Sequence, residues 1–261
     1  MQSRIIILIL SCILASCSIG MHKVARMSPE MIETSGLAEI DGQLFTINDS
    51  GDTSRVYSFG KDGKLRSAFI IEGAENRDWE ALASNDDTLF IGDIGNNFKW
   101  KDTLVIYISE NQNLLGEIRF SYPNGKSFDS EAMIFYHDSL LIFTKNRKDG
   151  GAFVYGIPAL PGFHTATLLD SIEYKGMITG ADFDKETSTL ILVGYRNYHP
   201  FVMVYDECNP RHIGRYEYRK RAFTLRPARQ TEAILIKEKG KAWITSEQFW
   251  FRKGYLFEVR Y

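Results

Sequence analysis

The chain lacks the residue patterns on which several kinds of chemistry depend. Its three cysteines include no CxxC pair, and none of its five histidines is spaced from another as a metal-binding pair. A GxSxG nucleophile elbow, an HExxH zinc motif and a phosphate-binding P-loop are also missing. These absences argue against a disulfide framework, zinc chemistry and Ser-His-Asp hydrolysis.

A strong charge bias is absent as well, because the formal net charge is −2. Proteins that bind a nucleic-acid backbone rely on basic patches, so the near-neutral balance predicts no nucleic-acid partner. One basic stretch, residues 215–229, interleaves arginine and lysine with aromatic residues. An exposed outer strand and loop is favoured there over a patch for nucleic acid or lipid headgroups.

No hydrophobic run is long enough to form a mature transmembrane helix. The longest run follows Arg4, extends over residues 5–14 and has the layout of a secretory signal. It ends in Leu14-Ala15-Ser16-Cys17, which resembles the lipobox of bacterial lipoproteins. The resemblance implies that residues 1–16 are removed and that Cys17 carries lipid, which would hold the protein on a membrane. A conventional signal peptide with an incidental cysteine is the alternative.

The other two cysteines carry no predicted role, and the residue after Cys17 bears on the membrane. Cys12 is lost with the signal, and Cys208 is left alone beside a proline turn, where a tolerated small residue is expected. Ser18 stands where enterobacterial lipoproteins kept at the inner membrane carry aspartate. The lipoprotein resemblance therefore implies a cell-envelope protein attached to the outer membrane.

What the chain does contain is one segment type repeated five times. Each copy has a short apolar strand with a small or acidic opening, a hydrophobic strand with a polar end, and a strand built around an aromatic residue. The first strands open at residues 35–38, 79–82, 130–133, 179–182 and 231–234, and the third strands carry Tyr57, Tyr107, Tyr155, Tyr205 and Phe257. A period of roughly 40–50 residues with about four strands is typical of a β-propeller blade. The sequence thus predicts an all-β, five-bladed β-propeller.

The ends of the chain predict how the propeller closes. The first four repeats continue into fourth strands at residues 64–71, 117–122, 166–174 and 213–219, but the fifth ends at Tyr261 after its third strand. An unpaired sheet edge is unfavourable, and residues 22–27 are the only unused strand-like segment. We therefore expect one domain over residues 17–261, with blades at about 34–72, 78–122, 129–174, 178–219 and 230–261 plus 22–27.

Blade geometry predicts an acidic face. The start of the first strand and the end of the second lie at the same end of a blade, which brings Glu80, Glu131 and Glu232 together around the axis. The neighbouring second-strand ends carry Asp49, Asp93, Lys145, Tyr195 and Glu247. Grouped carboxylates are costly unless they are paired, hydrogen-bonded or bound to a cation, so this face is a candidate binding site. The alternative is that each glutamate only joins neighbouring blades. Gly36 and Gly180 replace the glutamate in two repeats and are expected to open space.

Three loop motifs lie at the same face. They are residues 48–52 (NDSGD), 76–80 (NRDWE) and 92–97 (GDIGNN). Asparagine, aspartate and glycine at these spacings suit tight turns. Arg77 beside Trp79 and Glu80 is not explained by turns, and the pair would present a stacking surface with a guanidinium donor. Asn96 is a further candidate ligand-binding residue.

At these three motifs the chain resembles a family of bacterial secreted propellers akin to the NHL, TolB-like and SdiA-regulated types. The resemblance implies the fold and the secreted compartment, and it supplies no established reaction. Relatives often carry acidic residues where this chain has Asn96 and Asn97, which weakens an implied metal site.

These residues are compatible with two functions. The favoured one is a lipid-anchored propeller that binds a protein partner or a small polar ligand through the face of Glu80, Glu131 and Glu232. The alternative is a hydrolase of a sugar, lactone or phosphoester. By analogy with other propellers, it would work with paired carboxylates or with a calcium ion held by Glu80, Asp93, Glu131 and Glu232. No cofactor is certain, and calcium is the candidate.

Overall fold

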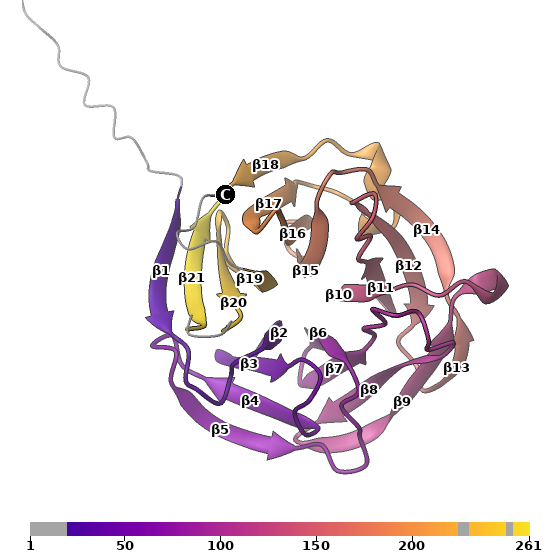
Figure 1. Cartoon of the computed structure of the whole chain (residues 1–261), viewed down its shortest axis with the longest axis horizontal. Coiled ribbons are helices and arrows are strands. Elements are labelled where there is room, and N and C mark those ends of the chain that lie inside the picture. The colour runs from indigo at the N-terminus through magenta and orange to yellow at the C-terminus, as the bar shows by residue number, and fades with distance from the viewer. Residues whose placement is uncertain (1–19, 224–229, 249–252) are drawn as a thin grey trace, which may run out of the picture.

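The computed structural model describes residues 20–223, 230–248 and 253–261. The predicted signal (residues 1–16), the predicted lipidation site Cys17 and part of the basic stretch lie outside these ranges. Within them the chain contains many strands and almost no helix, and the strands are arranged as five sheets around a central axis (Figure 1). This confirms the predicted all-β, five-bladed propeller. No helix in the described ranges is long and apolar enough to cross a membrane.

Each blade contains four antiparallel strands, which follow one another from the axis to the rim. The innermost strands are β2 (Thr34–Ile40), β6 (Trp79–Asn85), β10 (Ser130–Tyr136), β15 (Met177–Asp184) and β19 (Thr231–Glu238). The second strands are β3 (Gln43–Asn48), β7 (Thr88–Asp93), β11 (Ser139–Thr144), β16 (Thr189–Arg196) and β20 (Lys241–Ser246). The third strands are β4 (Arg55–Phe59), β8 (Leu104–Glu110), β12 (Ala152–Pro158), β17 (His199–Tyr205) and β21 (Tyr255–Arg260). The outer strands are β5 (Leu65–Ile70), β9 (Asn113–Ser121), β14 (Thr167–Ile172), β18 (Arg219–Ala222) and, in the fifth blade, β1 (Met21–Arg26).

The N-terminal strand closes the last blade, as predicted. β1 pairs antiparallel with β21, with Met21 opposite Val259 and Arg26 opposite Tyr255. The fifth sheet therefore has the order β1-β21-β20-β19, and the first and last described segments of the chain lie side by side (Figure 1). This pairing covers the sheet edge that the fifth repeat would otherwise expose.

The predicted fourth strand at residues 213–219 is wrong. Residues Pro210–Arg215 instead form a 3-10 helix, η2, and the outer strand β18 begins only at Arg219. Pro210 at the first turn and the Asn209 side chain, which accepts a hydrogen bond from the Arg211 N–H, favour this helix. Its Ile213 side chain is fully buried in the core between the third and fourth blades.

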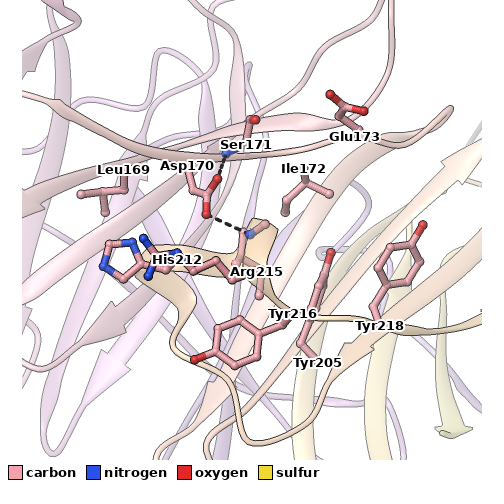
Figure 2. A pocket seen from close by; sticks show the side chains of 12 residues that line it. Leu169, Asp170, Ser171, Ile172, Glu173, Tyr205, His212, Arg215, Tyr216 and Tyr218 are labelled. Carbon is pink, nitrogen blue, oxygen red and sulfur yellow. Dashed lines mark hydrogen bonds between the residues drawn. The ribbon is translucent and has the colours of Figure 1, made fainter.

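The η2 helix also packs against the neighbouring blade. The Gly214 N–H donates a hydrogen bond of 2.9 Å to the Asp170 carboxylate on β14 (Figure 2). A cavity of about 550 Å³ lies beside this contact, lined by Tyr205, Tyr216 and Tyr218 among others. It belongs to the rim of the propeller.

A second feature that the sequence did not predict is β13 (Gly162–Thr165), which pairs parallel with β9 and extends the second blade to five strands.

The centre of the propeller is nearly closed. Between the inner strands remains a cavity of about 10 Å³. A Cβ at Gly36 would lie 2.6 Å from the Leu82 N, and one at Gly180 would lie 2.9 Å from the Glu232 carbonyl oxygen. The expectation that these glycines open space is therefore wrong: they let adjacent inner strands approach closely.

Candidate functional site

Every inner strand carries a β-bulge at its start. In β6, for example, Trp79 pairs with Asp93 and Ala81 pairs with Gly92, so Glu80 has no partner of its own. The same one-residue skip occurs in the other four inner strands. The residues in the five bulges are Ser35, Glu80, Glu131, Thr179 and Glu232. A bulge redirects a side chain out of the normal strand alternation, and bulges often occur next to functional sites.

The bulges confirm the equivalence of the three glutamates and correct the alignment of the other two repeats. Ser35 and Thr179 occupy the glutamate position, one residue before the glycines that the sequence alignment placed there. The alignment of Asp93 changes as well. Its equivalents at the ends of the second strands are Asn48 and Thr144, whereas the sequence alignment placed it with Asp49 and Lys145.

Two further positions in each blade complete the face. One lies two residues before the bulge, and the other lies at or just beyond the end of the second strand. The backbone joins them in two blades, through hydrogen bonds from the Asp49 N–H to the Glu33 carbonyl (2.9 Å) and from the Lys145 N–H to the Asp129 carbonyl (2.8 Å). In the second blade the donor to the Asp78 carbonyl is Gly95, one residue further along the loop (3.2 Å). The bulge position and these two further positions recur in all five blades, which gives fifteen positions around the axis. Carboxylates occupy more than half of them. We call these carboxylates the acidic face: Glu33, Asp49, Asp78, Glu80, Asp129, Glu131, Glu232 and Glu247.

Three of these carboxylates form a compact cluster. Asp49, Asp78 and Glu80 each bring one oxygen within 4.8 Å of the others, so the cluster could hold a metal ion. Glu80 is only 6% exposed and forms no hydrogen bond or ion pair with the residues that the structure describes. Burial and the nearby charge of Glu131 raise its pKa well above the ordinary value. Burial also raises the pKa of Asp78 to about 6, although Lys101 opposes the shift.

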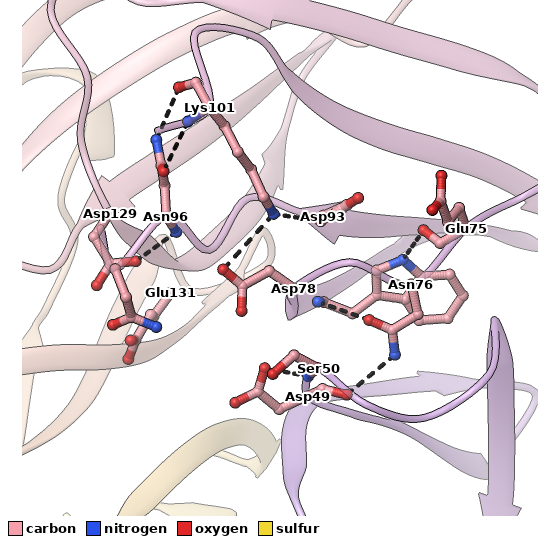
Figure 3. A network of polar contacts seen from close by, with 12 residues as sticks. Asp49, Ser50, Glu75, Asn76, Asp78, Asp93, Asn96, Lys101, Asp129 and Glu131 are labelled. Carbon is pink, nitrogen blue, oxygen red and sulfur yellow. Dashed lines mark hydrogen bonds and ion pairs between the residues drawn. The ribbon is translucent and has the colours of Figure 1, made fainter. Parts of the chain in front are cut away.

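The loop motifs explain why this cluster forms. A Cβ on Gly95 would lie 2.5 Å from the carboxyl carbon of Asp78 and 2.7 Å from the Cγ of Glu80. The second glycine of GDIG is therefore needed so that both acids of DWE can pack beside the loop. Asn76 joins its own motif, NRDWE, to the NDSGD loop. Its Nδ2 donates to the Asp49 carbonyl (3.1 Å), and its Oδ1 accepts from the Trp79 N–H (3.1 Å) (Figure 3).

Lys101 and Asn96 border the cluster from the loop between β7 and β8. The Nζ of Lys101 lies 3.1 Å from Asp93 and 3.7 Å from Asp78. Asn96 is buried, and its side chain donates to Ser127 (2.8 Å). It also donates to the Lys101 carbonyl (2.9 Å) and accepts from the Lys101 N–H (3.1 Å) (Figure 3). Asn96 therefore fixes the loop, and its role in ligand binding stays a prediction.

The third blade contributes a buried ion pair. Lys145 Nζ pairs with the Glu131 carboxylate, and both side chains are almost fully buried. Arg147 lies 3.1 Å from Glu131 on its other side, and the ammonium of Lys145 lies 5.6 Å from the centre of the Tyr195 ring. Burial alone would lower the pKa of Lys145, but Glu131 and Glu232 raise it. Burial raises the pKa of Glu131, and Lys145 opposes that shift.

The fifth blade places two glutamates around one amide. The Nε2 of Gln230 donates to Glu232 (3.2 Å) and to Glu247 (2.9 Å). Burial raises the pKa of both carboxyl groups. These two acids can therefore hold protons near neutral pH.

The predicted stacking surface at Trp79 is wrong. Trp79 is completely buried, packs against Tyr107 with ring centres 6.0 Å apart and donates its indole N–H to the Glu75 carbonyl (3.0 Å). It precedes the bulge, so its side chain enters the core between the first and second blades. Arg77 is exposed and pairs with Glu75 at 2.7 Å.

Cys208 is buried, which raises its pKa to about 11 and fits the expected absence of a reactive thiol.

An exposed aromatic pair that the sequence did not reveal lies at the same end of the second blade. Phe98 and Trp100 are 71% and 81% exposed. Their ring centres are 4.8 Å apart with planes inclined by 23°, a stacked arrangement. The available signal was an aromatic-x-aromatic pattern inside a polar loop, which does not indicate on its own whether the rings are buried.

Comparison with known proteins adds the fold and no more. No protein-family model and no curated protein matches the chain. Among solved structures it is similar to U3-55K (11% identity, TM-score 0.45, 87% of this chain) and spans 62% of that protein's length. It is also similar to a putative oxidoreductase (glucose dehydrogenase) from Thermus thermophilus (10% identity, TM-score 0.49, 92% of this chain and 99% of that one). A third similar structure is MPT-4, a mannose phosphorylase from Leishmania mexicana in complex with a phosphate ion (11% identity, TM-score 0.51, 92% and 87%). At these identities the likeness shows the propeller fold alone, and membership of the NHL or TolB-like group stays a prediction.

Proposed function

We propose that this protein is a lipid-anchored propeller of the cell envelope that binds a polar ligand or a protein partner through its acidic face, with calcium as its cofactor. The observation that carries the proposal is the cluster of Asp49, Asp78 and Glu80, whose oxygens lie within 4.8 Å of one another and in which Glu80, only 6% exposed, has no basic partner in the described chain. A buried, unpaired carboxylate is costly, and a bound cation would remove that cost.

The chemistry of the donors favours a hard cation. Only carboxylate oxygens make up the cluster, and oxygen ligands suit calcium, magnesium and manganese, whereas histidine and cysteine would favour zinc or copper. Calcium accepts six to eight oxygens in flexible geometry, so three carboxylates would leave positions for water or for a ligand. Asp49, Asp78 and Glu80 would hold the ion, and a ligand oxygen would complete its coordination.

Calorimetric titration with calcium tests the cation site. The wild-type protein should bind calcium, and Glu80→Gln and Asp78→Asn should each weaken binding at least tenfold because one charged ligand is lost. Glu117→Gln is the matched control, since that acid lies on the outer strand β9 and pairs with Arg119 away from the face. The proposal that calcium is the cofactor would be overturned if the wild-type protein bound no calcium and the purified protein contained no metal.

The anchor has a separate test. Cys17→Ser should release the protein from membranes or block its processing, because the lipid would have no attachment point. Mass spectrometry of the mature N-terminus reports the lipid directly. Unchanged membrane partitioning and an unmodified wild-type N-terminus would contradict the anchor and leave the cation site unaffected.

A second candidate function is hydrolysis at the same face. It is favoured by the pair Glu232 and Glu247, which share the Gln230 amide and whose raised pKa values suit a carboxylic acid that donates a proton near neutral pH. Chromogenic sugar, lactone and phosphoester substrates would be tested with and without calcium. Activity that disappears in Glu232→Gln and Glu247→Gln would establish the enzyme.

A further inference from the structure

We propose that the ligand of the acidic face is a saccharide, which stacks on Phe98 and Trp100 while its hydroxyl groups reach the neighbouring carboxylates. This inference rests on the proposed binding function of the acidic face and names its ligand class. It is carried by the position of the aromatic pair and by the chemistry beside it.

The aromatic pair is held in place although it is exposed. Asn96, two residues before Phe98, bonds to Ser127, to both backbone groups of Lys101 and, through its own N–H, to Asp129 at 2.9 Å. The loop is therefore closed by hydrogen bonds on both sides of the two rings. Exposed large apolar side chains on a fixed loop are a common mark of a binding site.

The same loop connects the rings to the carboxylates. Lys101 follows Trp100 directly, and its ammonium lies 3.1 Å from Asp93 and 3.7 Å from Asp78. Asp78 belongs to the cluster with Asp49 and Glu80. The Cα atoms of Trp100 and Lys101 are about 3.8 Å apart, as in any adjacent pair. Trp100 and Asp78 are therefore separated by one residue step and the length of the Lys101 side chain, which a ligand of a few sugar rings would span.

The combined chemistry selects the ligand. A pyranose ring has a flat C–H face that packs on an aromatic ring, and its edge carries hydroxyl groups that donate to carboxylates and coordinate a hard cation. An anionic bilayer fits less well, because its headgroups would repel the carboxylates of the acidic face, which lies at the same end of the propeller. A cationic peptide fits the carboxylates but would meet Lys99 between the two rings, which is exposed.

Binding to an array of neutral oligosaccharides of glucose, mannose, galactose and N-acetylglucosamine, with calcium present, tests the proposal. The full-length protein in detergent should bind at least one class, and calorimetry should show a loss of tenfold or more in Trp100→Ala and Phe98→Ala. Trp100→Tyr should restore most of the affinity. Phe163→Ala is the control, since Phe163 is 66% exposed on β13 at the rim and should change affinity less than twofold.

Other outcomes would overturn the saccharide. Failure of the wild type to bind any sugar would do so, as would sugar binding that survives Trp100→Ala. Flotation of the Cys17→Ser protein on phosphatidylethanolamine–phosphatidylglycerol vesicles, abolished by Trp100→Ala, would show that the pair inserts into lipid instead. Calcium titration of Trp100→Ala separates the two proposals, because its calcium affinity should equal that of the wild type. If no variant binds calcium but sugar binding still depends on Trp100, the cation is wrong and the saccharide stands.

Discussion

Lys145 and Glu131 form an ion pair in which both side chains are almost fully buried, at the point where the third blade meets the axis. Removing one partner of a buried pair leaves the other charge uncompensated, which typically costs about 3–5 kcal/mol. Lys145→Met should therefore lower the free energy of unfolding by about 3 kcal/mol, at the low end because Arg147 still contacts Glu131. Urea denaturation followed by tryptophan fluorescence measures the change.

The control for this prediction lies in the same network. Arg147 also contacts Glu131 at 3.1 Å, but its side chain is 45% exposed. Exposed ion pairs contribute about 1 kcal/mol or less, so Arg147→Met should have a much smaller effect than Lys145→Met. Equal effects of the two substitutions would show that burial does not determine the strength of this pair.

Gly95 gives a prediction that links a loop motif to the cation. In Gly95→Ala the new methyl group would collide with the Asp78 carboxyl group and with Glu80, so one or both acids must move. We expect a stability loss of about 1–3 kcal/mol and a calcium affinity reduced at least tenfold. Gly116→Ala on the rim is the comparison, because its Cβ would meet only the Pro161 side chain, at 3.1 Å. Calorimetry that shows normal calcium binding in Gly95→Ala would argue against the cluster as the site.

The repeat was sufficient to predict the blades, the closure by β1 and the equivalence of Glu80, Glu131 and Glu232. The register at the start of the inner strands was not predictable. A bulge adds one unpaired residue but requires no particular residue type, so the sequence does not reveal its position. That single residue decides that Trp79 is buried while Glu80 faces the axis, and that Ser35, not Gly36, is equivalent to Glu80. The exposure of Trp100 was hidden for a different reason: it depends on the hydrogen bonds of Asn96, which join residues far apart in the sequence.

The closure by β1 has a direct consequence for stability. Deleting residues 22–27 would expose the edge of β21 and remove the partners of Tyr255, Leu256 and Phe257. The loss should be several kcal/mol, which corresponds to a melting temperature lower by about 10 °C for a chain of this size. Differential scanning calorimetry of the protein with and without the deletion measures it. An unchanged melting temperature would mean that the pairing contributes little.

The acidic face predicts how stability depends on pH and calcium. A carboxyl group whose pKa is higher in the folded than in the unfolded protein binds more protons when folded, so stability falls as the pH rises from the unfolded to the folded pKa. For Asp78 this window runs from the ordinary value of 3.8 to about 6, and the shift corresponds to at most about 3 kcal/mol. Glu80 shifts in the same direction, again with burial as the main cause.

Burial raises the pKa of Glu131 and of Glu232 to about 8, so without calcium the melting temperature should fall between about pH 4 and pH 8. Glu80→Gln should be more stable than the wild type at pH 8 because it lacks the buried carboxyl group. Calcium should raise the wild-type melting temperature most at pH 8, where more of the carboxylates are ionised than at lower pH, and should have little effect on Glu80→Gln. Thermal scans across this pH range, with calcium and with a chelator, measure both effects. If chelation leaves the wild-type curve unchanged at every pH and Glu80→Gln is less stable than the wild type at pH 8, the glutamate has a structural role in the folded blade and does not hold a cation.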